Sequence, residues 1–126
     1  MAHDNTRIMG LMISSRETER AHQVIREGIE AYFRDYAKDS SLPDGFESEI
    51  ILLDGYRKGG YGKYDDDIER CIREEYCRDG IPLDPIYTAK AFWGMKQYLK
   101  DQGITGKKIL FLHTGGAPLF YDYLQR

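Results

Sequence analysis

The sequence predicts an α/β fold in which a parallel sheet of about three or more strands is flanked by helices. Three short apolar runs, at residues 8–13, 50–53 and 109–112, are too brief for helices and suit strands buried on both faces. The segments that follow them have helical spacing of apolar residues, and strands that alternate with helices are typical of a parallel sheet. A chain of 126 residues suits a single domain, so we expect one α/β domain over residues 1–126.

Composition excludes several classes of protein. The hydrophobic content of 41% and the charged content of 31% are those of a folded chain, and the net charge of −3 comes from interleaved acids and bases. Without a basic stripe, nucleic acid is not an expected partner. No apolar run approaches the roughly 20 residues that a membrane helix needs, and the N-terminus lacks the apolar core of a signal peptide. We therefore expect a cytoplasmic protein that does not bind membranes.

The two cysteines carry little functional information. Cys71 and Cys77 fall six residues apart in one expected helix, where a disulfide cannot form between them. Neither has the spacing of a metal site. We expect both to be free thiols.

The N-terminal third predicts a strand followed by a long helix. Residues 8–13 form the strand, and Ser14 and Glu17 have the spacing of a capping box that would open the helix directly after it. Apolar residues from Ala21 to Tyr36 then recur on one helical face. The helix is expected to end before the Pro-Gly loop at residues 40–45.

The central third predicts a second strand, a glycine-rich loop and a second helix. Residues 50–53 form the strand, and residues 54–62 form the loop. Three aspartates at residues 65–67 are favourable at a helix start because they oppose the positive end of the helix dipole. They also have the composition of a cation site, which is the weaker alternative. Gly80 is the expected end of this helix.

The last third predicts two more helices around a third strand. Pro82 and Pro85 favour an extended segment, and a helix runs from residue 87 or 88 to Gln102, with Gly103 as its cap. Residues 109–112 form the strand and lead into Thr114-Gly115-Gly116, and residues 118–124 form a closing helix.

Three loops that end strands or extended segments carry the candidate site residues. They are residues 59–62, 85–90 and 113–116, and in a doubly wound sheet they would converge on one crevice. Their chemically useful side chains are Tyr61, Tyr87, Thr88, Lys90, His113 and Thr114. The tyrosines, Lys90 and His113 also have ordinary structural interpretations: rim tyrosines, a lysine on a helix surface and a histidine at a strand end. From the residues alone we predict a glycine-lined ligand crevice.

Three ordered motifs extend this interpretation. GGYG at 59–62, LDPIYTAK at 83–90 and HTGGAPLF at 113–120 resemble the C-terminal part of a family of pyridoxal-phosphate enzymes. This is the D-cysteine desulfhydrase and 1-aminocyclopropane-1-carboxylate deaminase family, with the tryptophan synthase beta-like fold type II. The resemblance covers nearly all of the chain, more weakly before the first motif.

The resemblance implies a role for five residues. Tyr61 and Tyr87 match tyrosines that face and act on the substrate, and are the expected catalytic residues. Thr114 matches the threonine that hydrogen-bonds the pyridine nitrogen of pyridoxal phosphate, with Gly115 and Thr88 as further cofactor-binding residues. Deaminases of the family tend to carry glutamate at the position of Thr88 and leucine at that of Thr114, so the chain resembles the desulfhydrase branch.

The family's enzymes are more than twice as long as this chain. Their first half supplies the lysine that holds the cofactor, an asparagine beside the ring and a phosphate-binding loop, none of which is recognisable here. Lys90 matches a different lysine of the family. We therefore expect the C-terminal portion of a lyase or deaminase for a small amino acid, inactive alone, that forms a homo-oligomer or pairs with a complementary N-terminal half. A non-catalytic oligomerising or partner-binding module and an independent small-ligand or phosphate-binding domain remain the alternatives.

Overall fold

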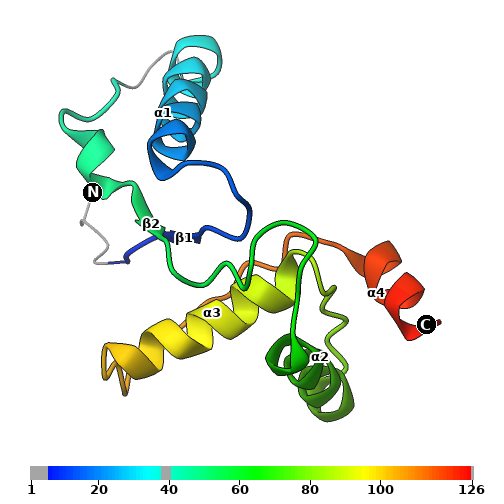
Figure 1. Cartoon of the computed structure of the whole chain (residues 1–126). Helices are drawn as coiled ribbons and strands as arrows, with labels where there is room; N and C mark the ends of the chain where they lie inside the picture. The colour runs from blue at the N-terminus through cyan, green and yellow to red at the C-terminus, as the bar shows by residue number, and fades with distance from the viewer. Residues whose placement is uncertain (1–5, 38–40, 126) are drawn as a thin grey trace. The chain divides into compact units, whose positions relative to one another are not determined.

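A computed structural model describes residues 6–37 and 41–125 (Figure 1). Within these residues the chain forms two compact units. The first contains residues 6–12, 16–37 and 41–54, and the second contains residues 13–15 and 55–125. The expectation of one domain over residues 1–126 stays a prediction.

The first unit is a strand–helix–strand arrangement. Strands β1 (Met9–Leu11) and β2 (Ile51–Leu53) pair in parallel, with Met9 opposite Ile51. Helix α1 (Thr18–Asp35) connects them, followed by a short 3-10 helix, η1 (Phe46–Glu49). The pairing continues past the strands, because the Met12 amide donates to the Leu53 carbonyl at 3.0 Å. The predicted parallel α/β arrangement is confirmed.

The second unit is built from three helices: α2 (Asp66–Asp79), α3 (Thr88–Asp101) and α4 (Ala117–Leu124). Its core contains Ile68, Cys71 and Ile72 from α2, Ala89 from α3, Phe120 from α4 and Leu83 from the α2–α3 connection. Half-buried aromatic residues surround this cluster. The three helices and the α2–α3 connection thus share one apolar core.

The helix ends of the second unit follow the sequence closely. Asp65 is the N-cap of α2, and its side chain accepts a hydrogen bond from the Ile68 amide at 3.3 Å. Gly80 ends α2 in the left-handed region, and Pro118 lies in the first turn of α4. These three predictions are confirmed.

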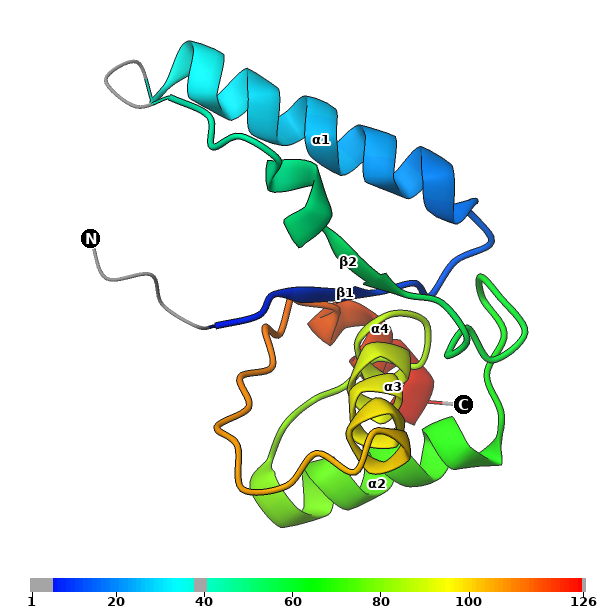
Figure 2. The ribbon, with the colours of Figure 1, turned by 90° about the vertical axis from the view of Figure 1, so that its left-hand side faces the viewer.

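The predicted third strand is wrong. Residues 107–116 form open chain between α3 and α4 (Figure 2), and the described sheet contains β1 and β2 alone. Leu110 and Leu112 are 92% and 77% exposed rather than buried on both faces. A strand requires a hydrogen-bonded neighbour, and among the described residues no segment pairs with this one.

The predicted capping box of α1 is also wrong. The helix begins later, with Glu17 as N-cap and without a side-chain cap. The Ser14 carbonyl accepts a hydrogen bond from Arg57 Nη1 at 2.6 Å, and the Thr18 hydroxyl donates to Asp54 at 2.9 Å. The sequence motif was outweighed by contacts between residues about 40 positions apart.

The two cysteines are both free, as expected. Cys71 is buried and Cys77 is exposed, and burial raises the pKa of Cys71 to about 11.

Among the helices described, none combines the length and the apolar character that crossing a membrane requires.

We predict that Ile72→Ala lowers the free energy of unfolding by about 2–5 kcal/mol, because Ile72 is 1% exposed and belongs to the core cluster that also contains Leu83 and Phe120. Urea denaturation followed by circular dichroism measures this loss. Glu74→Ala, at an exposed position of the same helix, is the control and should change stability by less than about 0.5 kcal/mol. Equal losses in both variants would show that the cluster is not the core.

Candidate functional site

Two tyrosine side chains meet at the edge of the second unit. The Tyr61 and Tyr87 hydroxyls lie 2.9 Å apart, and the rings are in edge-to-face contact with centroids 5.9 Å apart. Tyr61 comes from the glycine-rich loop before α2, and Tyr87 is the N-cap residue of α3. Tyr61 and Tyr87 are 59% and 37% exposed, so the pair lies at the surface of the second unit.

The contact changes the acidity of one phenol. The pKa of Tyr87 is raised by its hydrogen bond with Tyr61, then by burial and by the negative charges that Tyr61 and Asp84 can carry. Since a tyrosine ordinarily titrates near pH 10, Tyr87 holds its proton at neutral pH. The pair therefore presents an O–H donor whose partner hydroxyl can replace the donated proton.

Asp84 fixes the backbone that carries Tyr87. Its carboxylate is fully buried and accepts hydrogen bonds from the amides of Ile86, Tyr87 and Thr88 at 2.9, 2.8 and 3.0 Å. The Thr88 hydroxyl donates to the same carboxylate at 2.6 Å and accepts from the Asp84 amide at 2.8 Å. One side chain thus satisfies the amides of Tyr87 and Thr88 at the start of α3 and the Ile86 amide directly before it.

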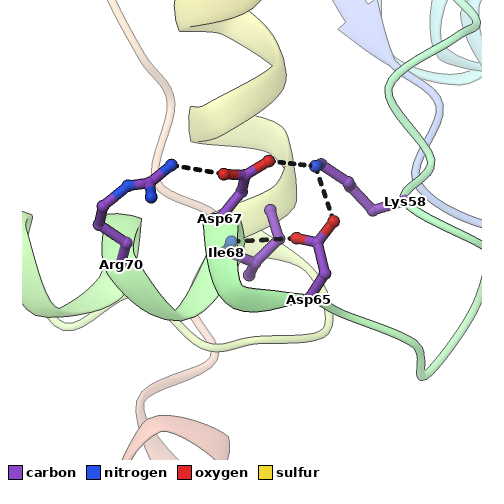
Figure 3. A network of polar contacts seen from close by, with 5 residues as sticks. All are labelled: Lys58, Asp65, Asp67, Ile68 and Arg70. Atoms are coloured by element: carbon purple, nitrogen blue, oxygen red, sulfur yellow. Dashed lines mark hydrogen bonds and ion pairs between the residues drawn. The ribbon is translucent and has the colours of Figure 1, made fainter.

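The glycine-rich loop is held by an ionic network at the start of α2 (Figure 3). Lys58 Nζ lies 2.7 Å from a carboxylate oxygen of Asp65 and 2.7 Å from one of Asp67, and Asp67 also pairs with Arg70. The Lys58 ammonium is 4.1 Å from the centre of the Trp93 ring on α3. Although burial opposes it, the hydrogen bonds to Asp65 and Asp67 raise the pKa of Lys58. The base of the loop is therefore tied to both α2 and α3.

The third loop approaches the same place through the backbone. His113 Nε2 lies 3.2 Å from the Pro82 carbonyl, and the Gly115 amide donates to His113 Nδ1 at 3.2 Å. Because Nδ1 accepts, the ring proton lies on Nε2 and is donated to Pro82. A Cβ added to Gly116 would lie 2.8 Å from Asp84 Cγ, so this residue packs directly against the Asp84 carboxylate.

The predicted site residues are therefore in different situations. Tyr61 and Tyr87 are in contact, Thr114 and Gly115 are exposed in the third loop, and Thr88 is buried with its hydroxyl bonded to Asp84. Loops 59–62 and 85–90 meet at the tyrosine pair, and Gly116 of the third loop packs against Asp84, whereas the ligand crevice stays a prediction. The functional roles of the five residues stay predictions.

Sequence reasoning misjudged one residue and missed two. Lys90 is not on the helix surface; it is 0% exposed, and its ammonium donates to the Gly60 carbonyl. Asp84 and Lys58 were not singled out. An aspartate before proline at a helix start, with threonine four residues on, was the available signal for Asp84, whereas Lys58 carries none.

Known proteins similar to this chain were found by sequence and by structure, although no family model matches the chain. A Pyrococcus abyssi protein named putative 1-aminocyclopropane-1-carboxylate deaminase is 40% identical over 116 residues, which are 92% of this chain and 33% of that protein. D-cysteine desulfhydrase of Klebsiella pneumoniae subsp. pneumoniae is 40% identical over 89 residues, which are 67% of this chain and 26% of that protein.

A solved structure agrees with the sequence matches. The crystal structure of a homologue of the same deaminase superposes with a TM-score of 0.67 at 30% identity, covering 94% of this chain and 34% of that one. The chain thus spans about a third or less of the length of the relatives it matches.

We predict that Gly116→Ala destabilises the second unit more than Gly115→Ala does. Both glycines have positive φ, 93° and 114°, so either substitution strains the backbone by about 1–3 kcal/mol. At Gly116 the new methyl group also meets Asp84, whereas nothing lies within 4 Å at Gly115. The clash should add about 1–3 kcal/mol in urea denaturation. Equal losses would show that Gly116 does not pack on Asp84.

Proposed function

We propose that this chain is the substrate-facing portion of an enzyme of the 1-aminocyclopropane-1-carboxylate deaminase and D-cysteine desulfhydrase family. The premise is that the chain matches one region of that family in sequence and fold. The reaction is a lyase or deaminase step on a small amino acid, with D-cysteine as the favoured substrate. Tyr61 and Tyr87 are its catalytic residues.

The tyrosine pair is the observation that carries this proposal. A hydroxyl that keeps its proton at neutral pH is an acid for the atom that leaves the substrate, and for D-cysteine that atom is sulfur. When one phenol gives its proton to the sulfur, the other hydroxyl, 2.9 Å away, can pass its own proton to the phenolate, and solvent then reprotonates the exposed pair. Two tyrosines on separate, anchored loops are suited to this proton transfer.

The third loop fits pyridoxal phosphate by the chemistry of its donors. When bound, this cofactor withdraws electrons from the α-carbon of an amino acid, and the protein adjusts that effect through its partner at the ring nitrogen. Thr114 is exposed, and its neutral hydroxyl can donate a hydrogen bond to that nitrogen without supplying a negative charge. At Gly115 a ligand could approach the backbone, because a Cβ added there would have no atom within 4 Å apart from its chain neighbours.

Thr88 contributes to the same site through the loop. Its hydroxyl is bonded to Asp84, which in turn holds the amides of Ile86 and Tyr87. We assign Thr88 the role of keeping Tyr87 in place beside the cofactor, where deaminases of the resembling family tend to have glutamate.

The proposal includes a complementary polypeptide that supplies the cofactor lysine. Lys90, the lysine of the central motif, is buried and donates to the Gly60 carbonyl, so its amine is not available to a cofactor aldehyde. We expect the chain to be inactive alone and active when combined with the remaining region of a relative or in a homo-oligomer that completes the site.

We predict that Tyr87→Phe lowers kcat by about 10²–10⁴-fold while changing KM less, because only the proton-carrying hydroxyl is removed. The measurement is sulfide release from D-cysteine by this chain co-expressed with the complementary region of the Pyrococcus abyssi relative. Tyr61→Phe should behave similarly, and Thr114→Ala should shift the absorption of the bound cofactor while retaining some turnover.

Tyr32→Phe is the matched control, because Tyr32 lies exposed on α1 in the first unit and should leave turnover unchanged. Full turnover in both Tyr87→Phe and Tyr61→Phe would exclude the proposed roles. Release of ammonia from 1-aminocyclopropane-1-carboxylate without sulfide release from D-cysteine would assign the complex to the deaminase branch instead.

A second candidate function, a non-catalytic module that binds a partner or a second copy, is favoured by one observation. Ile109, Leu110 and Leu112 are exposed on the open chain between α3 and α4. Three large apolar side chains on a segment with the composition of a buried strand indicate a surface that another polypeptide covers.

We predict that the chain self-associates and that Leu110→Lys weakens the association at least tenfold in sedimentation experiments, because a charge would be placed at the most exposed of these side chains. Leu124→Lys, an exposed apolar position on α4, is the control and should have little effect. A monomer at all concentrations in the unmodified chain would contradict this candidate.

A further inference from the structure

We propose that Lys90 is a positioning residue, which holds the Tyr61 loop against Tyr87 by binding the Gly60 carbonyl. The catalytic consequence of this inference rests on the proposed function, whereas the positioning itself does not. Lys90 is not among the residues to which the motifs assigned a role in catalysis or cofactor binding.

Both tyrosines of the pair are connected to the first turn of α3. Tyr87 is the N-cap residue of α3, and Lys90 lies three residues later in its first turn. The Lys90 ammonium reaches across to the carbonyl of Gly60, the residue directly before Tyr61. The start of α3 therefore carries Tyr87 itself and also the anchor of Tyr61.

The glycine-rich loop needs such an anchor. Gly60 has a φ of 96°, a region that glycine enters freely, so the loop backbone has little conformational preference of its own. Within the loop, the Gly60 amide donates to Arg57 at 3.0 Å and its carbonyl accepts from the Lys63 amide at 3.3 Å. These turn contacts shape the loop locally, whereas the bond from Lys90 ties it to α3.

Burial of the ammonium indicates a specific purpose. A lysine that is 0% exposed loses the hydration of its charge, and an apolar side chain of similar volume would often be as stable or more stable. Burial lowers the pKa of Lys90, while the negative charges of Asp65 and Asp84 raise it. These two carboxylates and the Gly60 dipole are the features that keep a cation in this place.

Lys58 and Lys90 hold the loop in different ways. Lys58 binds Asp65 and Asp67 through partly exposed ion pairs at the base of the loop (Figure 3). Such pairs contribute little to stability in water. Lys90 acts from the buried side and next to Tyr61, so its removal should affect the tyrosine contact more than the removal of Lys58.

The test is a pH titration of the full chain labelled with ¹³C in the tyrosine rings, with the ten signals assigned by Tyr→Phe variants. Tyr87 should titrate above its ordinary range in the unmodified chain because Tyr61 and Asp84 face it. Tyr61→Phe removes the hydrogen bond and should lower the Tyr87 pKa. Lys90→Met, which keeps the aliphatic length, should lower it by at least half as much.

Lys100→Met is the matched control, because Lys100 is exposed in the last turn of the same helix and should leave the titration unchanged. In the complemented enzyme, Lys90→Met should lower kcat as Tyr61→Phe does. If both tyrosine variants keep full turnover, the proposed function fails, but the titration of Lys90→Met still tests the positioning.

A folded Lys90→Met chain with an unchanged Tyr87 titration would overturn the inference. If Lys90→Met does not fold, the unmodified chain supplies the test: the Lys90 ammonium should give a slowly exchanging ¹⁵N signal with a coupling to the Gly60 carbonyl carbon. An exposed, rapidly exchanging ammonium without that coupling would overturn the inference as well.

Discussion

The candidate site depends on the Asp84 carboxylate. A fully buried negative charge is costly unless donors surround it, and here three amides and one hydroxyl do so. The same bonds begin α3 and fix the backbone of Tyr87. Gly116 is packed against the carboxylate from the third loop, where a larger residue would not fit. One side chain thus sets the start of a helix, the position of a candidate acid and the approach of the loop carrying Thr114.

Two lysine ammonium groups hold the glycine-rich loop. Lys58 neutralises Asp65 and Asp67 at the start of α2, while Lys90 binds a backbone carbonyl from within the unit. The loop itself has left-handed glycines and no core side chain, so cohesion comes from these contacts. Tyr61 is therefore exposed, while the residue before it, Gly60, is fixed by its bond to Lys90. A residue that acts on a ligand requires both exposure and a fixed backbone.

The sequence predicted the helices better than the strands, and the reason is physical. Helix ends are determined by nearby residues, so Asp65, Gly80 and Pro118 indicated them correctly. The motifs also indicated Tyr61 and Tyr87 individually, whereas their contact depends on how two loops meet in the folded chain. Lys90 was misjudged because its bond to the Gly60 carbonyl joins residues 30 positions apart. The contact of Asp84 with Gly116 likewise joins distant residues, although the bonds of Asp84 within its own loop had a local signal. Contacts over such separations leave little trace in local composition.

The failed third strand tells most about the molecule. Residues 109–112 have the composition of a strand buried on both faces, but Leu110 and Leu112 lie in solvent because no described segment pairs with them. The neighbouring loop nevertheless keeps its contacts, since His113 meets Pro82 and Gly116 meets Asp84. Residues 109–116 therefore combine two features: exposed leucines at 110 and 112, and a loop fixed by the contacts of His113 and Gly116 within the second unit. Burial of the leucines requires another polypeptide surface, which the proposed complementary region would supply.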